Sequence, residues 1–448
     1  AARAISVLAF FVAIFVIVME IFMPWVVDIL APGFANDPGK IELASSLSRI
    51  TFPFLLFISI VSFQSGILNS LDRFAAPAAA PVILNLVMIF AIFAFTPFGA
   101  TPAQSVAVGV TLAGFLEILW LAYFLRRENV FIKPCFNIPA LLRDSDIRTL
   151  FKRIAPGVLG AGIYQINMVV DTIIVSLVGT GAISWLYYAN RLQQLPLGVV
   201  GAAISVALLP ILSHHLKAEA LKEAEHTQNK AVEYGAMLSV PAAVALIVLA
   251  VPTINILFQH GKFGALQTAM TAQAVIAYAV GLPAYVLVKA LAPNFFARGD
   301  TRTPVKYSIV VLFTNLAFSL LLMKPFGHVG IAAATTIAAF VSLYQYCRGL
   351  KKRGYWQFSE ELRCKICKII ASSLVMGGVL WLGTTVFDIL LDGWLRQVLL
   401  IKLGIFGFLC VLGVASFGIM TKITGVLDTA EIRRLLSRKG KKDAKNTA

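Results

Sequence analysis

A single arginine lies inside one of the longest apolar segments of this sequence. Arg191 stands between "SWLYYAN" and "LQQLPLGVVGAA", and an arginine at the centre of a membrane-spanning helix costs about 2.5–3.5 kcal/mol. At helical spacing its face also carries Tyr187, Tyr188 and Gln194, whereas leucines occupy the other faces. Such a polar face is expected to line a cavity or a bundle interior, where Arg191 would bind an anion.

The second residue of interest is Asp171, in the apolar segment "GAGIYQINMVVDTIIVSLV". Its helical face carries Asn167, and residues 171 and 191 are equally far from Gly181, where the chain is expected to turn. In an antiparallel hairpin the two charges would lie at similar depth. Two interpretations remain open: Asp171 and Arg191 form a structural ion pair, or they face an aqueous cavity in which Asp171 binds a cation or a proton.

The elements that position these residues are expected to be membrane-spanning helices. Of the 448 residues 59% are hydrophobic and 13% are charged, and apolar runs of about 20 residues, enough to cross ~30 Å of hydrocarbon, follow one another. The pattern predicts an all-α polytopic membrane protein with about twelve transmembrane helices. The predicted spans are 5–27, 46–69, 78–96, 103–125, 154–178, 182–212, 231–255, 268–297, 305–326, 328–349, 366–388 and 397–422.

The basic residues give the orientation of these spans. Most of the 38 Lys and Arg residues fall in one alternating set of connections, and basic loops remain on the cytoplasmic side. Both termini are therefore expected in the cytoplasm. The net charge of +16 is a topology signal, and no nucleic-acid-binding module accompanies it.

Two basic connections divide the chain, and a faint repeat supports the division. The segments "FPFLLFISIVSFQSGILNSLDRFAAP" and "LPAYVLVKALAPNFFARGDTRTP" lie six spans apart and share an early Pro, a turn with Arg and Asp, and a Pro opening the next helix. Two pseudo-repeated lobes are typical of secondary transporters. The predicted domains are an N-lobe (1–125), an amphipathic cytoplasmic connection (126–153), a C-lobe (154–349), a basic loop (350–365), a C-terminal helix pair (366–422) and a basic tail (423–448).

Several motifs resemble those of one transporter family. The segments "SWLYYANRLQQLPLGVVGAAISVALLPILS", "FQHGKFGA", "KALAPNFFARGDTRTPVK" and "APGFANDPGK" are similar to the MurJ (MviN-type) lipid II flippases of the MOP exporter superfamily, and the resemblance covers nearly the whole chain. It implies two six-helix lobes plus a final helix pair, fourteen spans in all. The twelve spans above would then be the third to the fourteenth, with the first two helices missing from the front.

The resemblance also implies a substrate and its site. Family members move undecaprenyl-diphosphate-linked disaccharide-pentapeptide across the bacterial cytoplasmic membrane through a cationic cavity, and one cavity arginine matches Arg191. Many members have Asp before this Arg, where this chain has Asn190. Lipid II would bind at Arg191 with the flanking polar side chains, because guanidinium groups suit diphosphates. The expected substrate-binding residues are Arg191, Tyr187, Tyr188, Gln194 and Asn190.

Some members of the family bind a sodium ion, and three positions match its ligands: Asp171, Asn315 and Thr335. A second acidic ligand would be Ser319 here. The resemblance therefore implies Na⁺ or H⁺ as a possible coupling ion and no other cofactor. The C-terminal pair, which contains Gly377, Gly378, Gly404 and Gly407, would form the groove for the isoprenoid tail, although the glycines equally suit close helix packing.

The leading hypothesis is a non-enzymatic, alternating-access flippase for lipid II in the bacterial inner membrane. Its expected partners are membrane lipids and the cell-wall synthesis machinery, and not nucleic acid. One alternative is a cation-coupled multidrug exporter, or another exporter of lipid-linked oligosaccharides, from the same superfamily. A membrane enzyme acting on lipid carriers is a weaker alternative, because the sequence contains no Walker motif, nucleophile elbow or paired-carboxylate motif.

Overall fold

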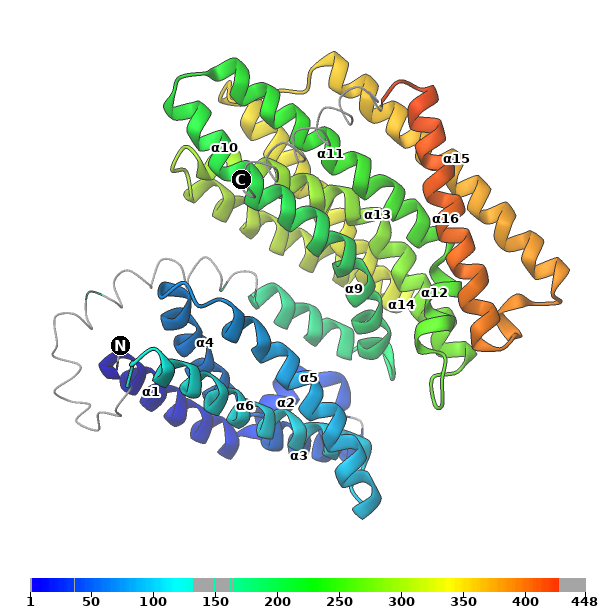
Figure 1. The fold of residues 1–448 in the computed structure, drawn as a ribbon. Coiled ribbons are helices and arrows are strands. Elements are labelled where there is room, and N and C mark those ends of the chain that lie inside the picture. The colour runs from blue at the N-terminus through cyan, green and yellow to red at the C-terminus, as the bar shows by residue number, and fades with distance from the viewer. Residues whose placement is uncertain (1, 36, 132–148, 150–161, 163–164, 427–448) are drawn as a thin grey trace, which may run out of the picture. The chain divides into compact units, whose positions relative to one another are not determined.

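The computed structural model describes residues 2–35, 37–131, 149, 162 and 165–426. The chain divides into two compact units, Ala1–Gln165 and Ile166–Ala448 (Figure 1). Among the described residues, ten helices are long and apolar enough to cross a membrane. The prediction of an all-α, multi-span protein is therefore confirmed.

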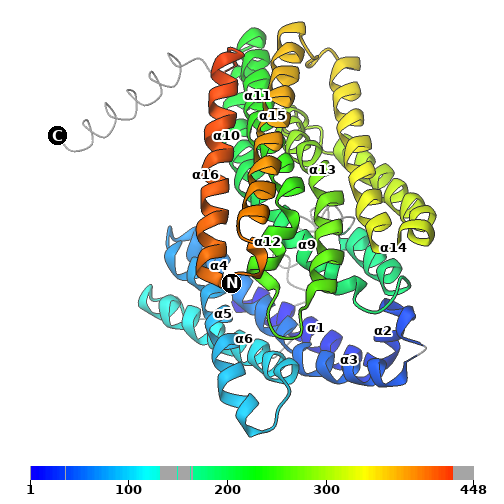
Figure 2. The ribbon, with the colours of Figure 1, turned by 90° about the vertical axis from the view of Figure 1, so that its right-hand side faces the viewer.

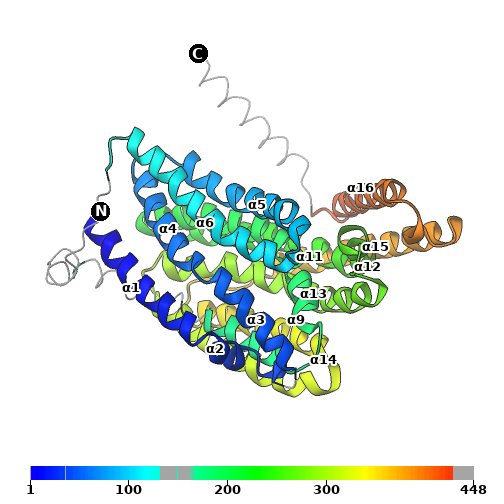
Figure 3. The ribbon, with the colours of Figure 1, turned by 90° about the horizontal axis from the view of Figure 1, so that it is seen from below.

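The first unit is built around three long helices packed side by side, α4, α5 and α6 (Figure 3). Their shared core contains Val61, Leu68 and Leu121. A capping box opens α6, in which Thr101 accepts from the backbone N–H of Gln104 and the Gln104 side chain accepts from that of Thr101. The helices of this unit are α1 (Ala2–Ile21), α2 (Met23–Leu30), α3 (Pro38–Thr51), α4 (Phe54–Ser70), α5 (Ala75–Phe95) and α6 (Pro102–Arg127), with 3₁₀ turns at Pro32–Phe34 and Thr96–Phe98.

Two predicted spans of this unit are broken near a proline. Span 5–27 is interrupted at Phe22, one residue before α2 begins with Pro24 in its first turn, and span 46–69 is divided at Pro53 between α3 and α4. Proline lacks the N–H that would continue the helical ladder. Each predicted span is thus a pair of helices.

The second unit contains the residues that the sequence analysis singled out. Its elements are the short helix Gln165–Ser176, which begins at the unit boundary, α9 (Ala182–Pro196), the π-helical segment Leu197–Gly201, α10 (Ala202–Lys217), α11 (Leu221–Val248), α12 (Ala250–Phe258), α13 (Ala265–Phe296), α14 (Arg302–Lys352), α15 (Glu360–Leu390), the 3₁₀ turn Trp394–Arg396 and α16 (Leu399–Ile423). Helix α13 is the centre of this unit, because α9, α10, α11, α12 and α14 all pack against it. The packing of each of these helices against α13 therefore determines which way its other side chains point.

Helix α14 is 51 residues long and reverses direction in its middle, so it contains two of the predicted spans. Gly327 has φ 55° and ψ −133°, which is not helical. A Cβ on Gly330 would lie 2.2 Å from the carbonyl oxygen of Leu322, and the rings of Tyr307 and Tyr346 are 5.2 Å apart. The two legs are thus antiparallel, as the predicted spans 305–326 and 328–349 require.

The C-terminal pair α15 and α16 packs on α11 and α12 (Figure 2). Ser359 caps α15 by accepting from the N–H of Leu362 at 3.2 Å. The buried contacts join Leu249 and Ile256 to Met376, Leu380 and Leu409 on the pair. The last two predicted spans are therefore docked on the second unit.

Other predictions fall outside the described residues. They concern most of the amphipathic connection 126–153, the first part of the predicted span 154–178 and nearly all of the tail 423–448. The described end of span 154–178 is the helix Gln165–Ser176.

Candidate functional site

The Arg191 face of α9 is the first candidate site. α9 buries Leu186, Ala189 and Leu192 in the core of the second unit, and Gln193 donates to the carbonyl of Tyr278 on α13 at 3.0 Å. These contacts fix the rotation of α9 about its axis. They leave Arg191 exposed on another face.

Four of the five predicted substrate-binding residues form one hydrogen-bonded set. Arg191 donates from Nη2 to the Tyr187 hydroxyl at 3.0 Å and from Nη1 to Gln194 Oε1 at 3.2 Å. Its guanidinium carbon lies 4.8 Å from the centroid of the Tyr187 ring, a cation–π contact. Gln194 in turn donates to Asn190 Oδ1 at 2.5 Å. The guanidinium is therefore held by two neutral side chains, Tyr187 and Gln194, on its own helix face.

Among the described residues Tyr188 forms no hydrogen bond with this set, but its ring meets the Tyr187 ring edge-on, with 6.0 Å between the centroids. Its ring also packs against Phe258 at 4.8 Å and Phe263 at 5.5 Å between centroids, and its contact with substrate stays a prediction. Residues 187 and 188 are one step apart on a helix, about 100° of rotation, so they face different directions.

The second candidate site joins the helix Gln165–Ser176 to both legs of α14. Asn315 donates from Nδ2 to Asp171 Oδ1 at 2.6 Å and to Asn167 Oδ1 at 3.3 Å, while Asn167 donates to Asp171 Oδ2 at 3.2 Å. The hydroxyls of Ser319 and Thr335 each lie 3.4 Å from Asn315 Oδ1. The structure thus brings together all three predicted ion-site residues, although Asp171 precedes Asn315 by 144 positions in the sequence.

Asn315 is the centre of this cluster. It is 1% exposed, and Ser319 beside it is fully buried. A buried carboxamide must satisfy both its N–H donors and its oxygen, which it does here through residues of the two α14 legs and of the helix Gln165–Ser176. Asn167 had been seen on the face of Asp171, but its place between Asp171 and Asn315 was not predicted.

Asp171 and Arg191 have separate partners. Among the described residues no carboxylate lies within the 4.0 Å ion-pair distance of the Arg191 guanidinium, and Asp171 is held by the two asparagines. The interpretation as a structural ion pair is therefore not supported. Their equal distance from Gly181 says nothing about the direction in which each side chain points.

The donor set at Asp171 suits a monovalent cation better than a divalent one. It offers one carboxylate, the Oδ1 atoms of Asn167 and Asn315, and the Thr335 hydroxyl, all hard oxygen ligands of the kind that alkali and alkaline-earth ions take. In the described chain no three His, Cys, Asp or Glu residues gather into a metal-binding group. A single negative charge balances one positive charge, which fits Na⁺ or H⁺.

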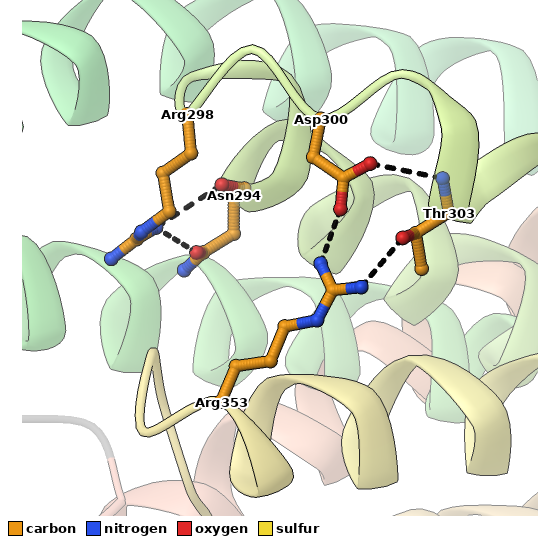
Figure 4. A network of polar contacts seen from close by, with 5 residues as sticks. All are labelled: Asn294, Arg298, Asp300, Thr303 and Arg353. Atoms are coloured by element: carbon orange, nitrogen blue, oxygen red, sulfur yellow. Dashed lines mark hydrogen bonds and ion pairs between the residues drawn. The ribbon is translucent and has the colours of Figure 1, made fainter.

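A third polar cluster closes one end of the second unit (Figure 4). Asp300, in the turn between α13 and α14, forms an ion pair with Arg353 just beyond α14 and accepts from the Thr303 N–H at 3.0 Å. Burial alone would raise the pKa of Asp300, but the hydrogen bonds from Arg353 and Thr303 outweigh it and hold the pKa at about 2, against an ordinary 3.8. We call this pair the Asp300–Arg353 clasp.

The clasp was not predicted from the sequence. The Thr303 hydroxyl belongs to it as well, because it accepts from Arg353 Nη2 at 2.7 Å. The spacing Asp-x-x-Thr at the start of a helix is a capping signal that could have been recognised. The partner at position 353 could not, because only the reversal of α14 brings it back to the turn.

The glycines of the predicted tail groove are of two kinds. A Cβ on Gly377 would lie 2.6 Å from Val244 of α11, so this glycine permits close packing. Gly378, Gly404 and Gly407 have open space where a Cβ would be. The groove remains a prediction. Gly378, Gly404 and Gly407 leave space in which an isoprenoid tail could lie.

Comparison with known proteins identifies relatives over most of the chain. The family model described as "Lipid II flippase MurJ" matches residues 1–398. "Probable lipid II flippase MurJ" of Rhizobium tropici is 38% identical over 427 residues, 94% of this chain and 79% of the relative. "Lipid II flippase MurJ" of Burkholderia cenocepacia is 31% identical over 388 residues, 86% of this chain and 74% of the relative.

Solved structures agree with these sequence relatives. A lipid II flippase MurJ in an inward closed conformation superposes with a TM-score of 0.77 at 25% identity, covering 94% of this chain and 82% of that one. An inward-facing multidrug transporter of the MATE family, in the MOP superfamily, gives 0.64 at 18% identity, covering 77% and 79%. The second likeness concerns the fold alone.

Proposed function

This chain belongs to the MurJ family of lipid II flippases, and we propose that its Arg191 face binds the diphosphate of lipid II during translocation. The protein is a multi-pass inner-membrane flippase that moves lipid II in peptidoglycan synthesis. The family match over residues 1–398 is the observation that carries this function. What we propose is which residues carry out the translocation and in which order the steps occur.

Arg191 has the chemistry that a diphosphate requires. Two of its N–H groups are engaged by Tyr187 and Gln194, and the other three have no partner among the described residues. A planar, permanently charged donor fork matches phosphate oxygens in a bidentate manner. With Asn190 in place of an acidic neighbour, the charge of Arg191 is not neutralised locally, which favours an anionic substrate over a cationic drug.

Asp171 supplies the second half of the proposed mechanism. A monovalent cation, Na⁺ or H⁺, would bind beside Asp171 and tie the helix Gln165–Ser176 to α14 through Asn315 and Thr335. The Asn315 carboxamide now presents its N–H to Asp171, and rotation about χ2 would present its oxygen to the cation instead. Alternating access then follows if cation binding and lipid II binding favour different arrangements of these helices.

The remaining parts of the proposal concern orientation and partners. If the connections rich in Lys and Arg face the cytoplasm, the Asp300–Arg353 clasp and both termini would lie on the cytoplasmic side. Translocation without covalent chemistry needs no catalytic group, so the protein would act as a transporter and not as an enzyme. Membrane lipids and cell-wall synthesis proteins are its proposed partners, and nucleic acid is not.

Export of lipid II tests the role of Arg191. The natural gene would be expressed in cells depleted of their own lipid II flippase, and lipid II at the outer face would be measured at equal membrane abundance. We expect wild type to restore export, Arg191→Ala to abolish it and Arg191→Lys to restore it partly. Arg348→Ala is the matched control, because Arg348 contacts Tyr344 with the same spacing, at 3.4 Å, outside the Arg191 face.

Two results would contradict the proposal. Full export by Arg191→Ala would show that the Arg191 face does not hold the substrate. Failure of well-expressed wild type, together with efflux of fluorescent cationic drugs that Arg191→Ala does not affect, would indicate a drug exporter.

A further inference from the structure

A cavity of about 230 Å³ lies at the end of the second unit that carries the Asp300–Arg353 clasp. We propose that it binds a phosphate group, either free or as the headgroup of an anionic phospholipid. Its walls come from the start of α11, the turn after α13 and the segment after α14. The residues that the argument uses are Glu225, Arg298, Lys351, Tyr355 and Trp356.

Arg298 is held in this cavity by a chain of buried polar side chains. Its Nη1 donates to the backbone carbonyl of Asn294 at 3.1 Å and also to Asn294 Oδ1 (Figure 4). Asn294 donates to Gln228 Oε1 at 3.1 Å, and Gln228 donates to the carbonyl of Ala290 at 2.9 Å. Asn294 is 1% exposed and Gln228 is fully buried. The guanidinium is therefore positioned by groups that cannot move independently of the core.

Aromatic side chains fix the plane of the same guanidinium. Arg298 stacks over the Tyr355 ring at 4.1 Å from its centroid. Trp356 is 3% exposed and donates from its indole to Asn229 Oδ1 at 2.6 Å, which anchors this wall to α11. A donor fork with one nitrogen fixed and one face covered is preorganised for a planar, bidentate contact.

The charge of Arg298 is not balanced by a carboxylate. Asp300, two residues away, is taken by Arg353. Glu225 also lines the cavity, yet among the described residues it forms no ion pair with Arg298 or with Lys351, the second cation of the lining. Partial burial lowers the pKa of Arg298, so its charge is less well solvated than that of a surface arginine. An anion bound in the cavity would compensate by stabilising the charge of the Arg298 guanidinium.

The position of the cavity indicates phosphate in particular. α11 and α13 are apolar, membrane-length helices, and the cavity lies where the first begins and the second has ended. Trp and Tyr are enriched at the level of lipid headgroups, where phosphates are the abundant anions. A guanidinium and an ammonium with two aromatic walls match a phosphate ester better than a bare halide.

Thermal stability tests the proposal with inorganic phosphate as the probe. Purified full-length protein in detergent would be titrated with sodium phosphate against sodium chloride at equal ionic strength. We expect phosphate to raise Tm for wild type and for Lys352→Gln, whose exposed side chain neighbours Lys351 but does not line the cavity. Arg298→Gln and Lys351→Gln should each need about tenfold more phosphate, or more, for the same rise.

Bilayer discs distinguish the two sources of phosphate. Discs of phosphatidylcholine alone would be compared with discs containing phosphatidylglycerol. A Tm rise from phosphatidylglycerol but not from inorganic phosphate, lost in Lys351→Gln, supports a lipid headgroup, and a rise from both supports any phosphate group. No rise from either, or a rise that Lys351→Gln and Lys352→Gln reduce equally, would overturn the proposal. Lys351 is exposed, so its variant keeps the test valid even if Arg298→Gln fails to fold.

Discussion

The Asp300–Arg353 clasp gives the prediction that the structure specifies most closely. Asp300→Asn keeps the size of the side chain and removes its charge. The amide would still meet Thr303, but Arg353, which also packs over the Phe295 ring at 5.3 Å, would lose its carboxylate. We expect the variant to fold, with a looser turn between α13 and α14 and a lower Tm.

The size of the loss follows from the pKa of Asp300. A fall from 3.8 to about 2, at about 1.4 kcal/mol per pH unit, sets an upper limit of about 2.5 kcal/mol. The Asp300 and Arg353 side chains are 23% and 36% exposed, so solvent screening reduces this figure, and exposed pairs contribute about 0–1 kcal/mol. We therefore expect Asp300→Asn to destabilise the protein by about 1 kcal/mol.

The same pKa predicts a pH dependence of definite sign. Since folding lowers the pKa of Asp300, the folded state favours the ionised carboxylate. The stabilisation is fully present above the unfolded pKa of about 4 and is lost as the pH falls toward 2. Wild type and Asp300→Asn should therefore differ in Tm at pH 7 and converge near pH 2.

A double-mutant cycle with Arg353→Gln is the assay, with Tm in detergent measured for wild type, both single variants and the double variant. We expect coupling between the two positions, so that the double variant loses less than the sum of the single losses. The matched control is the Arg73–Glu128 pair of the first unit, at 2.8 Å, in which Arg73 is 61% exposed, and its coupling should be weaker. Additive losses at Asp300 and Arg353, or a Tm difference that persists at pH 2, would refute the reasoning.

Three further predictions concern other parts of the second unit. Gly330→Ala should prevent the α14 reversal and leave little folded protein, because its Cβ would meet backbone at 2.2 Å, whereas Gly404→Ala, in open space, should retain wild-type yield and Tm. Asp171→Asn should remove the Na⁺ or H⁺ dependence of lipid II export, and an unchanged dependence would place the coupling ion elsewhere. Trp356→Phe leaves Asn229 without its donor at 2.6 Å and should lower stability by about 1–3 kcal/mol; a Tm equal to that of wild type would argue against this bond.

The positions of the spans could be predicted, but their internal breaks could not. The predicted division between 326 and 328 coincides with Gly327, because a short polar turn between apolar runs is visible in the sequence. Prolines are visible too, yet Pro53 separates two helices while Pro283 lies inside an unbroken α13. α13 is packed against five neighbouring helices. Their packing keeps its backbone helical at Pro283, where one hydrogen bond is lost. That contact information is absent from a single sequence.

The candidate sites show a similar limit. Helical spacing correctly grouped Tyr187 and Gln194 with Arg191, because neighbours on one face follow from 3.6 residues per turn. It could not show that Tyr188 would turn to Phe258, which comes from a different helix. Asp171 and Asn167 could be read from the apolar segment itself, but Asn315 was linked to them by family resemblance alone, since it carries no sequence signal that points to a residue 144 positions earlier.

The internal repeat is faint in the sequence, but the backbone hydrogen bonds and φ angles of its two turns match closely. In the first unit the N–H of Arg73 donates to the carbonyl of Leu68, after Asp72 with φ 58°. In the second the N–H of Asp300 donates to the carbonyl of Phe295, after Gly299 with φ 73°. Both are the same helix-ending turn, so Arg73 and Asp300 occupy equivalent positions.

The ion-pair partners of Arg73 and Asp300, which are Glu128 and Arg353, also occupy equivalent positions. Glu128 precedes Asn129, with φ 58°, and Arg353 precedes Gly354, with φ 66°, each at the end of the second helix after its turn. The ion pair is thus retained with its charges exchanged, Arg–Glu in one unit and Asp–Arg in the other. Residue identity has diverged while the contact has persisted. In both units, therefore, an ion pair joins the turn to the end of the second helix after it. Either position can carry the positive charge, provided that the other carries the negative one.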